Sequence, residues 1–182
     1  MKSLIYYGQI YSDSELESIH QLIQDGTWKI NPKSDNAYRD ILDDKLITKD
    51  KIPYIPRIVD TYLNFIHQVQ SNYLKYFTDN KFTYNIKIAR YKEGHEYKYH
   101  VDELSSKYGE RVLSSITYLN DDFDGGETEI LDEIIVPQKN FTVIFPSNWV
   151  FLHKGLPILS GVKYIMVVHC YSNMSRSLYI NS

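Results

Sequence analysis

Two histidines and an aspartate stand at spacings that suit a metal ion. His100 and Asp102 are two residues apart, and His153 follows fifty-one residues after the aspartate. Side chains alternate between the faces of a strand, so His100 and Asp102 would project to the same side if one strand holds both. Two imidazoles and one carboxylate cover one face of an octahedral ion and leave its other positions open, as in mononuclear non-haem Fe(II) sites. The pattern predicts a metal site with room for chemistry at the open positions.

A lysine interrupts an apolar stretch ten residues after His153. The run from Val162 to Cys170 is β-branched and apolar except for Lys163 and His169. An ammonium buried without a partner is costly, so we expect Lys163 to face an anionic ligand such as a carboxylate or a phosphate. Each feature alone has a plainer interpretation. His-x-Asp occurs by chance, a single histidine is often a core or surface residue, and a lysine can extend from a sheet edge to water.

Taken together, several segments of the second half of the chain resemble one protein family. They are Ile88 to Gly94, Tyr99 to Asp102, Arg111 to Asn120, Gly125 to Thr128, His153 and Lys163. In order and spacing they are similar to the catalytic domain of prolyl 4-hydroxylases, within the Fe(II)/2-oxoglutarate-dependent dioxygenases. The resemblance covers roughly the last hundred residues and implies the double-stranded β-helix fold.

The resemblance also implies roles for individual residues. It implies that His100, Asp102 and His153 hold Fe(II), and that Lys163 binds the far carboxylate of 2-oxoglutarate. The charges of Fe(II), Asp102, 2-oxoglutarate and Lys163 then cancel, which favours binding where the dielectric constant is low.

Four further residues are expected around the same pocket. Tyr91 and Tyr118 match positions that contact the co-substrate, and Ser114 stands where relatives often carry a threonine near its distal carboxylate. His169 is six residues from Lys163, so a regular strand would place both on one face. We interpret His169 as a pocket-wall residue, not a fourth metal ligand. Ordinary strand packing is the alternative for all four.

The implied reaction is the oxidation of an unactivated C–H bond by O2, coupled to conversion of 2-oxoglutarate into succinate and CO2, with ascorbate as the expected reductant. A prolyl residue in a peptide or protein is the first hypothesis for the substrate. A free amino acid or another small molecule is an alternative, because no groove for a proline-rich ligand is evident. Two other hypotheses are a non-catalytic module that binds iron or 2-oxoglutarate and a cupin-like protein with a structural metal.

The remaining pattern predicts a mainly β protein with helices at its start. A capping box at Ser12 to Glu15 and apolar residues at helical spacing predict a helix that ends near Gly26, and a second stripe runs from Pro56 to Phe77. Strands are expected at 27–30, 82–91, 95–100, 111–120, 127–131, 141–145, 149–153 and 162–171. We expect a jelly roll braced by helices on one sheet, in a single domain over 1–182, with helical support in 1–80 and the β core in 81–172.

The composition limits the expected partners and the expected cellular location of the protein. The net charge of -3 gives no general attraction to nucleic acid or to anionic membranes, so neither is an expected partner. Cys170 is the one cysteine, which rules out an intrachain disulfide and favours a reducing, cytoplasmic location. No signal peptide or membrane-spanning run is evident, and we expect a soluble protein. The oligomeric state stays open, as does the question of whether the polar residues 31–51 form a lid over substrate.

Overall fold

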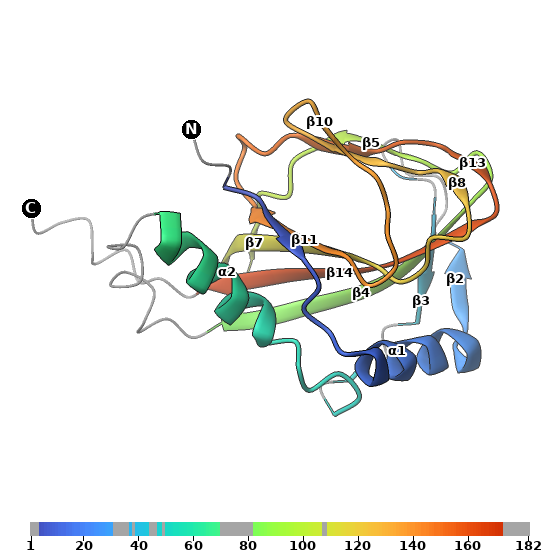
Figure 1. The fold of residues 1–182 in the computed structure, drawn as a ribbon, viewed down its shortest axis with the longest axis horizontal. Helices are drawn as coiled ribbons and strands as arrows, with labels where there is room; N and C mark the ends of the chain where they lie inside the picture. Colours follow the sequence, from blue (N-terminus) through green and yellow to red (C-terminus); the bar gives the residue numbers. More distant parts are fainter. Residues whose placement is uncertain are drawn as a thin grey trace, which may run out of the picture.

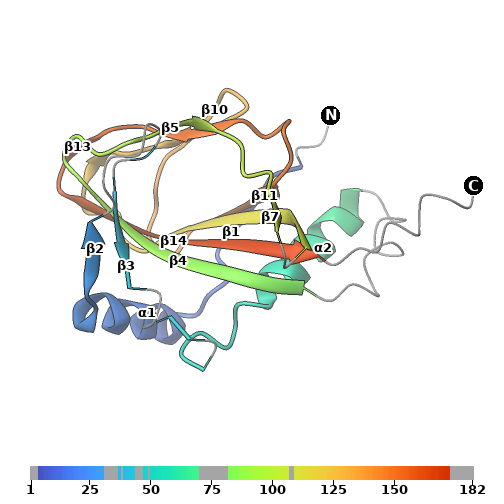
Figure 2. The ribbon, with the colours of Figure 1, turned by 180° about the vertical axis from the view of Figure 1, so that it is seen from behind.

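The structure is a computed structural model that describes residues 4–30, 37, 39–43, 47–48, 50–69, 82–106 and 109–172. In these residues two β-sheets face each other, and both helices lie on the outer side of the larger one (Figure 1, Figure 2). Such an arrangement buries one face of each sheet against the other, and the second face of the larger sheet beneath the helices.

The larger sheet is antiparallel, with strand order β1-β11-β7-β14-β4-β3-β2 and the short β6 paired to β7. Its central strands are the long ones, and the outer ones come from the start of the chain. The bounds are β1 Tyr6–Gly8, β2 Trp28–Ile30, β3 Asp40–Leu42, β4 Phe82–Lys92, β6 Ser105–Ser106, β7 Gly109–Tyr118, β11 Thr142–Pro146 and β14 Val162–Ser172.

The smaller sheet has the order β10-β9-β12-β5 and carries two of the candidate metal ligands. Its strands are short: β5 Tyr97–His100, β9 Thr128–Ile130, β10 Glu133–Ile135 and β12 His153–Gly155. A two-stranded sheet pairs β8 Asp124–Gly125 with β13 Ile158–Ser160. In the register of the smaller sheet, His153 pairs directly with His100, which brings the two imidazoles together.

Helix α1 (Asp13–Asp25) begins with the predicted capping box. The Ser12 hydroxyl accepts from the backbone N–H of Glu15, and the Glu15 carboxylate accepts from the backbone N–H of Ser12 at 2.8 Å. Helix α2 (Arg57–Val69) buries a stripe that includes Ile58, Tyr62 and Ile66. Both helices pack on the outer face of the larger sheet, and one hydrophobic core fills that interface.

Strand β14 shows how the two faces of the larger sheet divide. Met166, Val168 and Cys170 lie in the core under the helices, and none of the three is exposed. The alternate residues Lys163, Ile165, Val167 and His169 line the cavity between the sheets. The strand therefore places Lys163 and His169 on one face, as their even spacing predicted.

Most predicted elements are confirmed, with three differences. Trp149–Leu152 is not a strand: β12 begins at His153, and Trp149 is 72% exposed. Asp102 lies beyond the end of β5 at His100, so the two ligand candidates do not share a strand. Six of the described strands were not predicted, since each spans two or three residues and periodicity needs a longer run: β1, β3, β6, β8, β10 and β13.

Two expectations fall partly or wholly outside the described residues. The second helix is described to Val69, so its predicted extension to Phe77 lies outside, and so does most of the polar stretch 31–51. Among the helices that the structure describes, neither has the length and apolar character needed to cross a membrane.

Candidate metal centre and pocket

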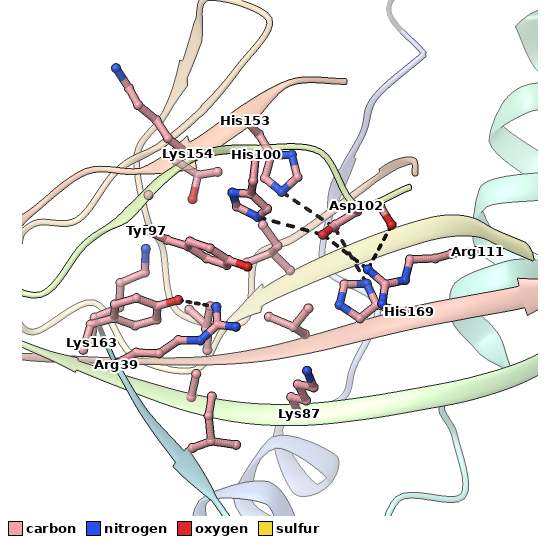
Figure 3. Close-up of a pocket in the computed structure, with 18 residues that line it drawn as sticks. Arg39, Lys87, Tyr97, His100, Asp102, Arg111, His153, Lys154, Lys163 and His169 are labelled. Carbon is pink, nitrogen blue, oxygen red and sulfur yellow. Dashed lines mark hydrogen bonds and ion pairs between the residues drawn. The ribbon is translucent and has the colours of Figure 1, made fainter. Parts of the chain in front are cut away.

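The side chains of His100, Asp102 and His153 converge at one point between the two sheets. One ligand atom from each lies within 4.8 Å of the others. The Nε2 atom of His100 is 3.9 Å from Asp102 Oδ1, and the Nε2 atom of His153 is 3.6 Å from Asp102 Oδ2. Figure 3 shows both rings directed toward this carboxylate. The structure thus brings together the three residues that the sequence singled out as metal ligands.

The ring orientations of both histidines are fixed in the same way. The Nδ1 atom of His100 donates to the carbonyl of Lys98 at 2.8 Å, and that of His153 donates to the carbonyl of Phe151 at 2.9 Å. A carbonyl only accepts, so Nδ1 carries a proton in both rings and Nε2 is the atom directed toward Asp102. Burial lowers the pKa of His100 to about 4, with His153 adding to the shift, so this imidazole is neutral at neutral pH. Two imidazoles whose Nε2 atoms face a carboxylate, each held by a hydrogen bond at Nδ1, suit a divalent metal.

Asp102 is held in place by Arg111 on β7. Arg111 Nη1 donates to the backbone carbonyl of Asp102 at 2.9 Å and lies 3.5 Å from its Oδ1, while Nη2 donates to the Tyr171 hydroxyl at 2.9 Å. Burial alone would raise the pKa of Asp102, but His169, His153 and the Ser114 hydroxyl hold it below its usual value. Asp102 is therefore ionised, as a metal ligand must be.

His169 stands beside this cluster without belonging to it. Its Nδ1 is 3.7 Å from Asp102 Oδ2 and 3.2 Å from the Ser114 hydroxyl, which in turn contacts the Ser147 hydroxyl at 2.7 Å. Burial lowers the pKa of His169 to about 3, which leaves it neutral. It lines the cavity next to Asp102.

Lys163 lies at the other end of the cavity and is 4% exposed. Its ammonium donates to the carbonyl of Gly126, and it lies 5.1 Å from the ring centre of Tyr118. Burial lowers the pKa of Lys163 to about 7, and Glu127 opposes that shift. A Cβ at residue 126 would meet Lys163 Cδ at 3.2 Å and Ile158 Cδ1 at 2.3 Å. A glycine with φ +69° is what lets the backbone approach the lysine.

The two predicted tyrosines both lie near Lys163. Tyr91 pairs with Lys163 across β4 and β14, and its hydroxyl accepts from Arg39 Nη1 at 2.9 Å. The hydroxyl of Tyr118 donates to Thr128 Oγ1 at 2.7 Å. Burial raises the pKa of both phenols, Tyr118 beyond the physiological range, so both stay protonated.

The position predicted for Ser114 needs correction. Ser114 pairs with His169 across β7 and β14, six residues along β14 from Lys163, and bonds to Ser147 and His169. It therefore lies at the Asp102 end of the cavity, away from the place where a distal carboxylate would meet Lys163. Thr128, which lines the cavity and bonds to Tyr118, is the hydroxyl residue at the Lys163 end.

The cavity measures about 190 Å³ and is lined by residues from both sheets. Sequence reasoning did not assign roles to several of its polar residues, among them Arg39, Lys87, Tyr97, Arg111 and Thr128. Arg39 precedes the three-residue strand β3 in a polar stretch without periodicity, so no local signal pointed to it. Lys87 could have been found, because it alternates with Ala89 and Tyr91 on the strand that carries the family-like segment.

Comparison with known proteins bears on this site. Residues 86–171 match the family model described as the 2OG-Fe(II) oxygenase superfamily, a stretch that contains His100, Asp102, His153 and Lys163. The chain carries a 2OG-Fe(II) oxygenase domain. A PKHD-type hydroxylase of Synechococcus sp. (strain CC9902) is 36% identical to it over 124 residues, which cover 62% of this chain. The chain spans 54% of the length of that relative.

Solved structures show that the oxygenase domain has the prolyl hydroxylase-like double-stranded β-helix fold. The viral collagen prolyl hydroxylase of Paramecium bursaria chlorella virus-1, in its 2OG complex, matches with a TM-score of 0.62 at 24% identity, over 91% of this chain and 95% of that one. A Trichoplax adhaerens prolyl hydroxylase in complex with a hypoxia inducible factor peptide fragment matches with a TM-score of 0.64 at 17% identity, over 96% and 86%. A Pseudomonas putida prolyl-4-hydroxylase gives 0.62 at 16% identity, over 92% and 91%.

Proposed function

We propose that this oxygenase domain is an Fe(II)- and 2-oxoglutarate-dependent hydroxylase that acts on a prolyl residue in a peptide or protein. The observation that carries the proposal is the pairing of the His100–Asp102–His153 cluster, whose ligand atoms converge, with a buried lysine, Lys163, at the other end of one cavity. One group suits a divalent metal and the other suits a distant carboxylate. A dicarboxylate that chelates a metal would use both.

The residues fit their proposed ligands on chemical grounds. His100, Asp102 and His153 would hold Fe(II), since their Nε2 and carboxylate oxygen atoms face one another and the opposite ring nitrogens are occupied. Lys163 would hold the far carboxylate of 2-oxoglutarate. When bound, iron and 2-oxoglutarate supply the oxidation: one oxygen atom of O2 enters the C–H bond, the other enters succinate, and CO2 is released.

The chain's own contribution is positioning and exclusion of water. Arg111 fixes Asp102 through its backbone carbonyl, and Thr128 fixes the Tyr118 hydroxyl near Lys163. Apolar side chains, Ile116, Ile165 and Val167, line the cavity between its two ends and keep that part dry. In a dry site the attraction between Lys163 and a carboxylate is stronger than it would be in water.

The prolyl substrate is supported by the neighbours alone. The three solved structures compared above are prolyl hydroxylases, and one of them holds a peptide fragment. A free amino acid or small-molecule substrate fits the same cavity chemistry and is the outcome to consider if peptides fail. A non-catalytic binding module would bind 2-oxoglutarate without turning it over.

Succinate formation tests the proposal. The wild type and Asp102→Ala would be incubated in air with Fe(II), ascorbate, 2-oxoglutarate and a panel of proline-containing peptides. We expect succinate from the wild type that rises with one peptide, together with a mass gain of one oxygen atom on that peptide. Asp102→Ala should fall to background because the metal loses its anionic ligand. Wild-type protein that binds metal and 2-oxoglutarate yet forms no more succinate than Asp102→Ala would contradict the enzyme proposal.

A further inference from the structure

The cavity carries more positive charge than the proposed cofactors can compensate. Among the described residues that line the cavity, Asp102 is the one carboxylate. Besides Lys154, four cationic side chains line it: Arg39, Lys87, Arg111 and Lys163. Lys154 pairs with Glu129 at 2.8 Å. Burial of unbalanced charge is costly, so a surplus of this kind in a cavity points to an anionic ligand.

A count of charges gives the size of the positive surplus. This count rests on the proposed function, because it includes bound Fe(II) and 2-oxoglutarate. The charges of Fe(II) and Lys163 are balanced by those of Asp102 and the two carboxylates of 2-oxoglutarate. Arg111 lies 3.5 Å from Asp102 Oδ1, but the charge of that carboxylate is already counted. Arg39 remains outside this balance, and it lines the same cavity, as does Lys87.

Arg39 is a mostly buried guanidinium whose contacts with the described residues are with neutral groups. Its Nη1 donates to the Tyr91 hydroxyl at 2.9 Å, its Cζ lies 4.3 Å from the ring centre of Tyr97, and its buried Nε has no hydrogen-bond partner among the described residues. Other arginines of the chain pair with carboxylates: Arg90 Nε lies 2.7 Å from Asp40, and Arg57 Nη2 lies 2.7 Å from Glu15. A planar fork of donors suits a carboxylate better than two phenol rings.

The position of Arg39 is built into the fold. The next residue, Asp40, lies 2.7 Å from Arg90 Nε and 3.0 Å from Lys92 Nζ. These two ion pairs hold β3 against β4. Because side chains alternate, Arg39 and Ile41 then face the cavity. Figure 3 shows Arg39 and Lys87 directed into the cavity from the side opposite His100 and His153. Arg39 is also separated from Lys163 by the Tyr91 side chain, which contacts both.

We propose that Arg39 and Lys87 form a second anion-binding subsite, distinct from Lys163, that takes a carboxylate of the substrate to be oxidised. The substrate is then acidic: a peptide with an aspartate or glutamate next to the oxidised residue, or one that presents its free C-terminal carboxylate there. Arg39 supplies the directional contact, and Lys87 adds positive charge on the same side of the cavity.

Direct binding tests this inference without turnover. Protein loaded with Mn(II) and saturated with 2-oxoglutarate would be titrated calorimetrically with blocked peptides that contain Glu-Pro, Gln-Pro, Pro-Glu or Pro-Gln, and with a Gln-Pro peptide that has a free C-terminus. We expect at least one carboxylate-bearing peptide to bind about tenfold or more tightly than its blocked glutamine counterpart. A preference for the side chain or for the free C-terminus would identify which carboxylate is recognised.

Variants locate the effect at Arg39. Arg39→Gln should remove the preference while the dissociation constant of 2-oxoglutarate changes less than twofold. Arg39→Lys, which keeps the charge, should retain part of the preference, and Lys87→Gln should reduce it. Arg57→Gln removes one positive charge far from the cavity and should leave the preference intact. Circular dichroism melting would check that each variant is folded.

Three results would overturn the inference. The first is equal binding, or no binding, of the acidic and amide peptides to the wild type. The second is a preference that survives in folded Arg39→Gln. The third is an Arg39→Gln variant that loses 2-oxoglutarate affinity instead, which would assign Arg39 to the co-substrate. Wild-type protein that binds neither Mn(II) nor 2-oxoglutarate would overturn the proposed function itself, which the first titration would show before any peptide is added.

Discussion

The two faces of the larger sheet bury opposite kinds of side chain. On the outer face Met166, Val168 and Cys170 pack beneath the helices with no exposed surface. On the inner face of the same strand, Lys163 and His169 are buried with their pKa values lowered by that burial. Apolar burial stabilises the fold, whereas burial of a titratable group without a counter-ion destabilises it. The comparison indicates that the outer face serves stability, and that the inner face gives up stability for ligand binding.

Lys163→Met should change ligand affinity and stability in opposite directions, and its effect on affinity should be the largest of those predicted here. Removing one partner of a buried charge pair costs about 2–5 kcal/mol of binding, so 2-oxoglutarate should bind the metal-loaded variant about 30-fold to 5,000-fold more weakly. The unliganded variant should be more stable by about 1–2 kcal/mol, since an apolar side chain replaces a buried ammonium. Calorimetric titration and urea unfolding measure the two quantities.

Lys29→Met is the matched control for this change. Lys29 is a surface lysine paired with Asp43 at 3.0 Å and is 56% exposed, so its loss should change neither quantity by much. Unchanged 2-oxoglutarate binding in Lys163→Met would contradict the role proposed for the inner face.

Met166→Ala tests the outer face. Met166 has no exposed surface and lies in the core under the helices. Truncating it should lower the free energy of unfolding by about 2–4 kcal/mol, through lost burial and the cavity left behind. The affinity of the folded protein for 2-oxoglutarate should be unchanged, because Met166 faces away from the cavity. A variant with intact stability and impaired binding would reverse the assignment of the two faces.

The pH dependence of 2-oxoglutarate binding gives a smaller but more specific effect. The pKa of Lys163 is about 7 without ligand, and a bound carboxylate should raise it. Binding then requires uptake of a proton above pH 7, so the affinity should fall as pH rises, by at most about tenfold per pH unit. Lys163→Arg stays charged and should bind with little dependence on pH between 7 and 9. Titrations in buffers of different ionisation enthalpy would measure the proton uptake directly.

The same pKa has a consequence of opposite sign for unliganded stability. The pKa of Lys163 is lowered in the folded protein from the ordinary 10.5 to about 7, so the unfolded chain binds more protons between these values. Stability of the ligand-free protein should therefore rise with pH through this window, as far as Lys163 determines it. Lys163→Met should lack that contribution, which thermal melts of the two proteins at pH 7 and pH 9 would show.

The fold could be predicted because its signals are local, and the ligand cluster because of the family resemblance. Period-two patterns marked β4, β7 and β14, and the capping box marked α1. His153 and Lys163 lie far from His100 in the chain, and their roles came from the resemblance to the prolyl 4-hydroxylase catalytic domain in order and spacing. Even there the detail differed: Asp102 lies past the end of β5, where Arg111 fixes it, and not within a strand.

What could not be predicted depends on pairing between distant segments. Arg39 reaches the cavity because β3 pairs with β4 and because Ala37 forms a bridge with Tyr97, sixty residues away in the chain. Ser114 was assigned to the wrong end of the cavity because its place depends on the register between β7 and β14, which a single sequence does not reveal. Trp149 and Val150 look like strand residues, yet the Asn148 side chain accepts from the Val150 N–H and forms a turn there.

The most direct test of the account is the binding of 2-oxoglutarate in the absence of O2, measured with and without Fe(II) on the wild type, Asp102→Ala and Lys163→Met. It needs no knowledge of the substrate. We predict that the wild type binds one equivalent only when Fe(II) is present, that Asp102→Ala loses this metal-dependent binding, and that Lys163→Met retains the metal but binds 2-oxoglutarate far more weakly. Equal binding by all three proteins, or binding by the wild type that ignores the metal, would contradict a site built from the His100–Asp102–His153 cluster and Lys163.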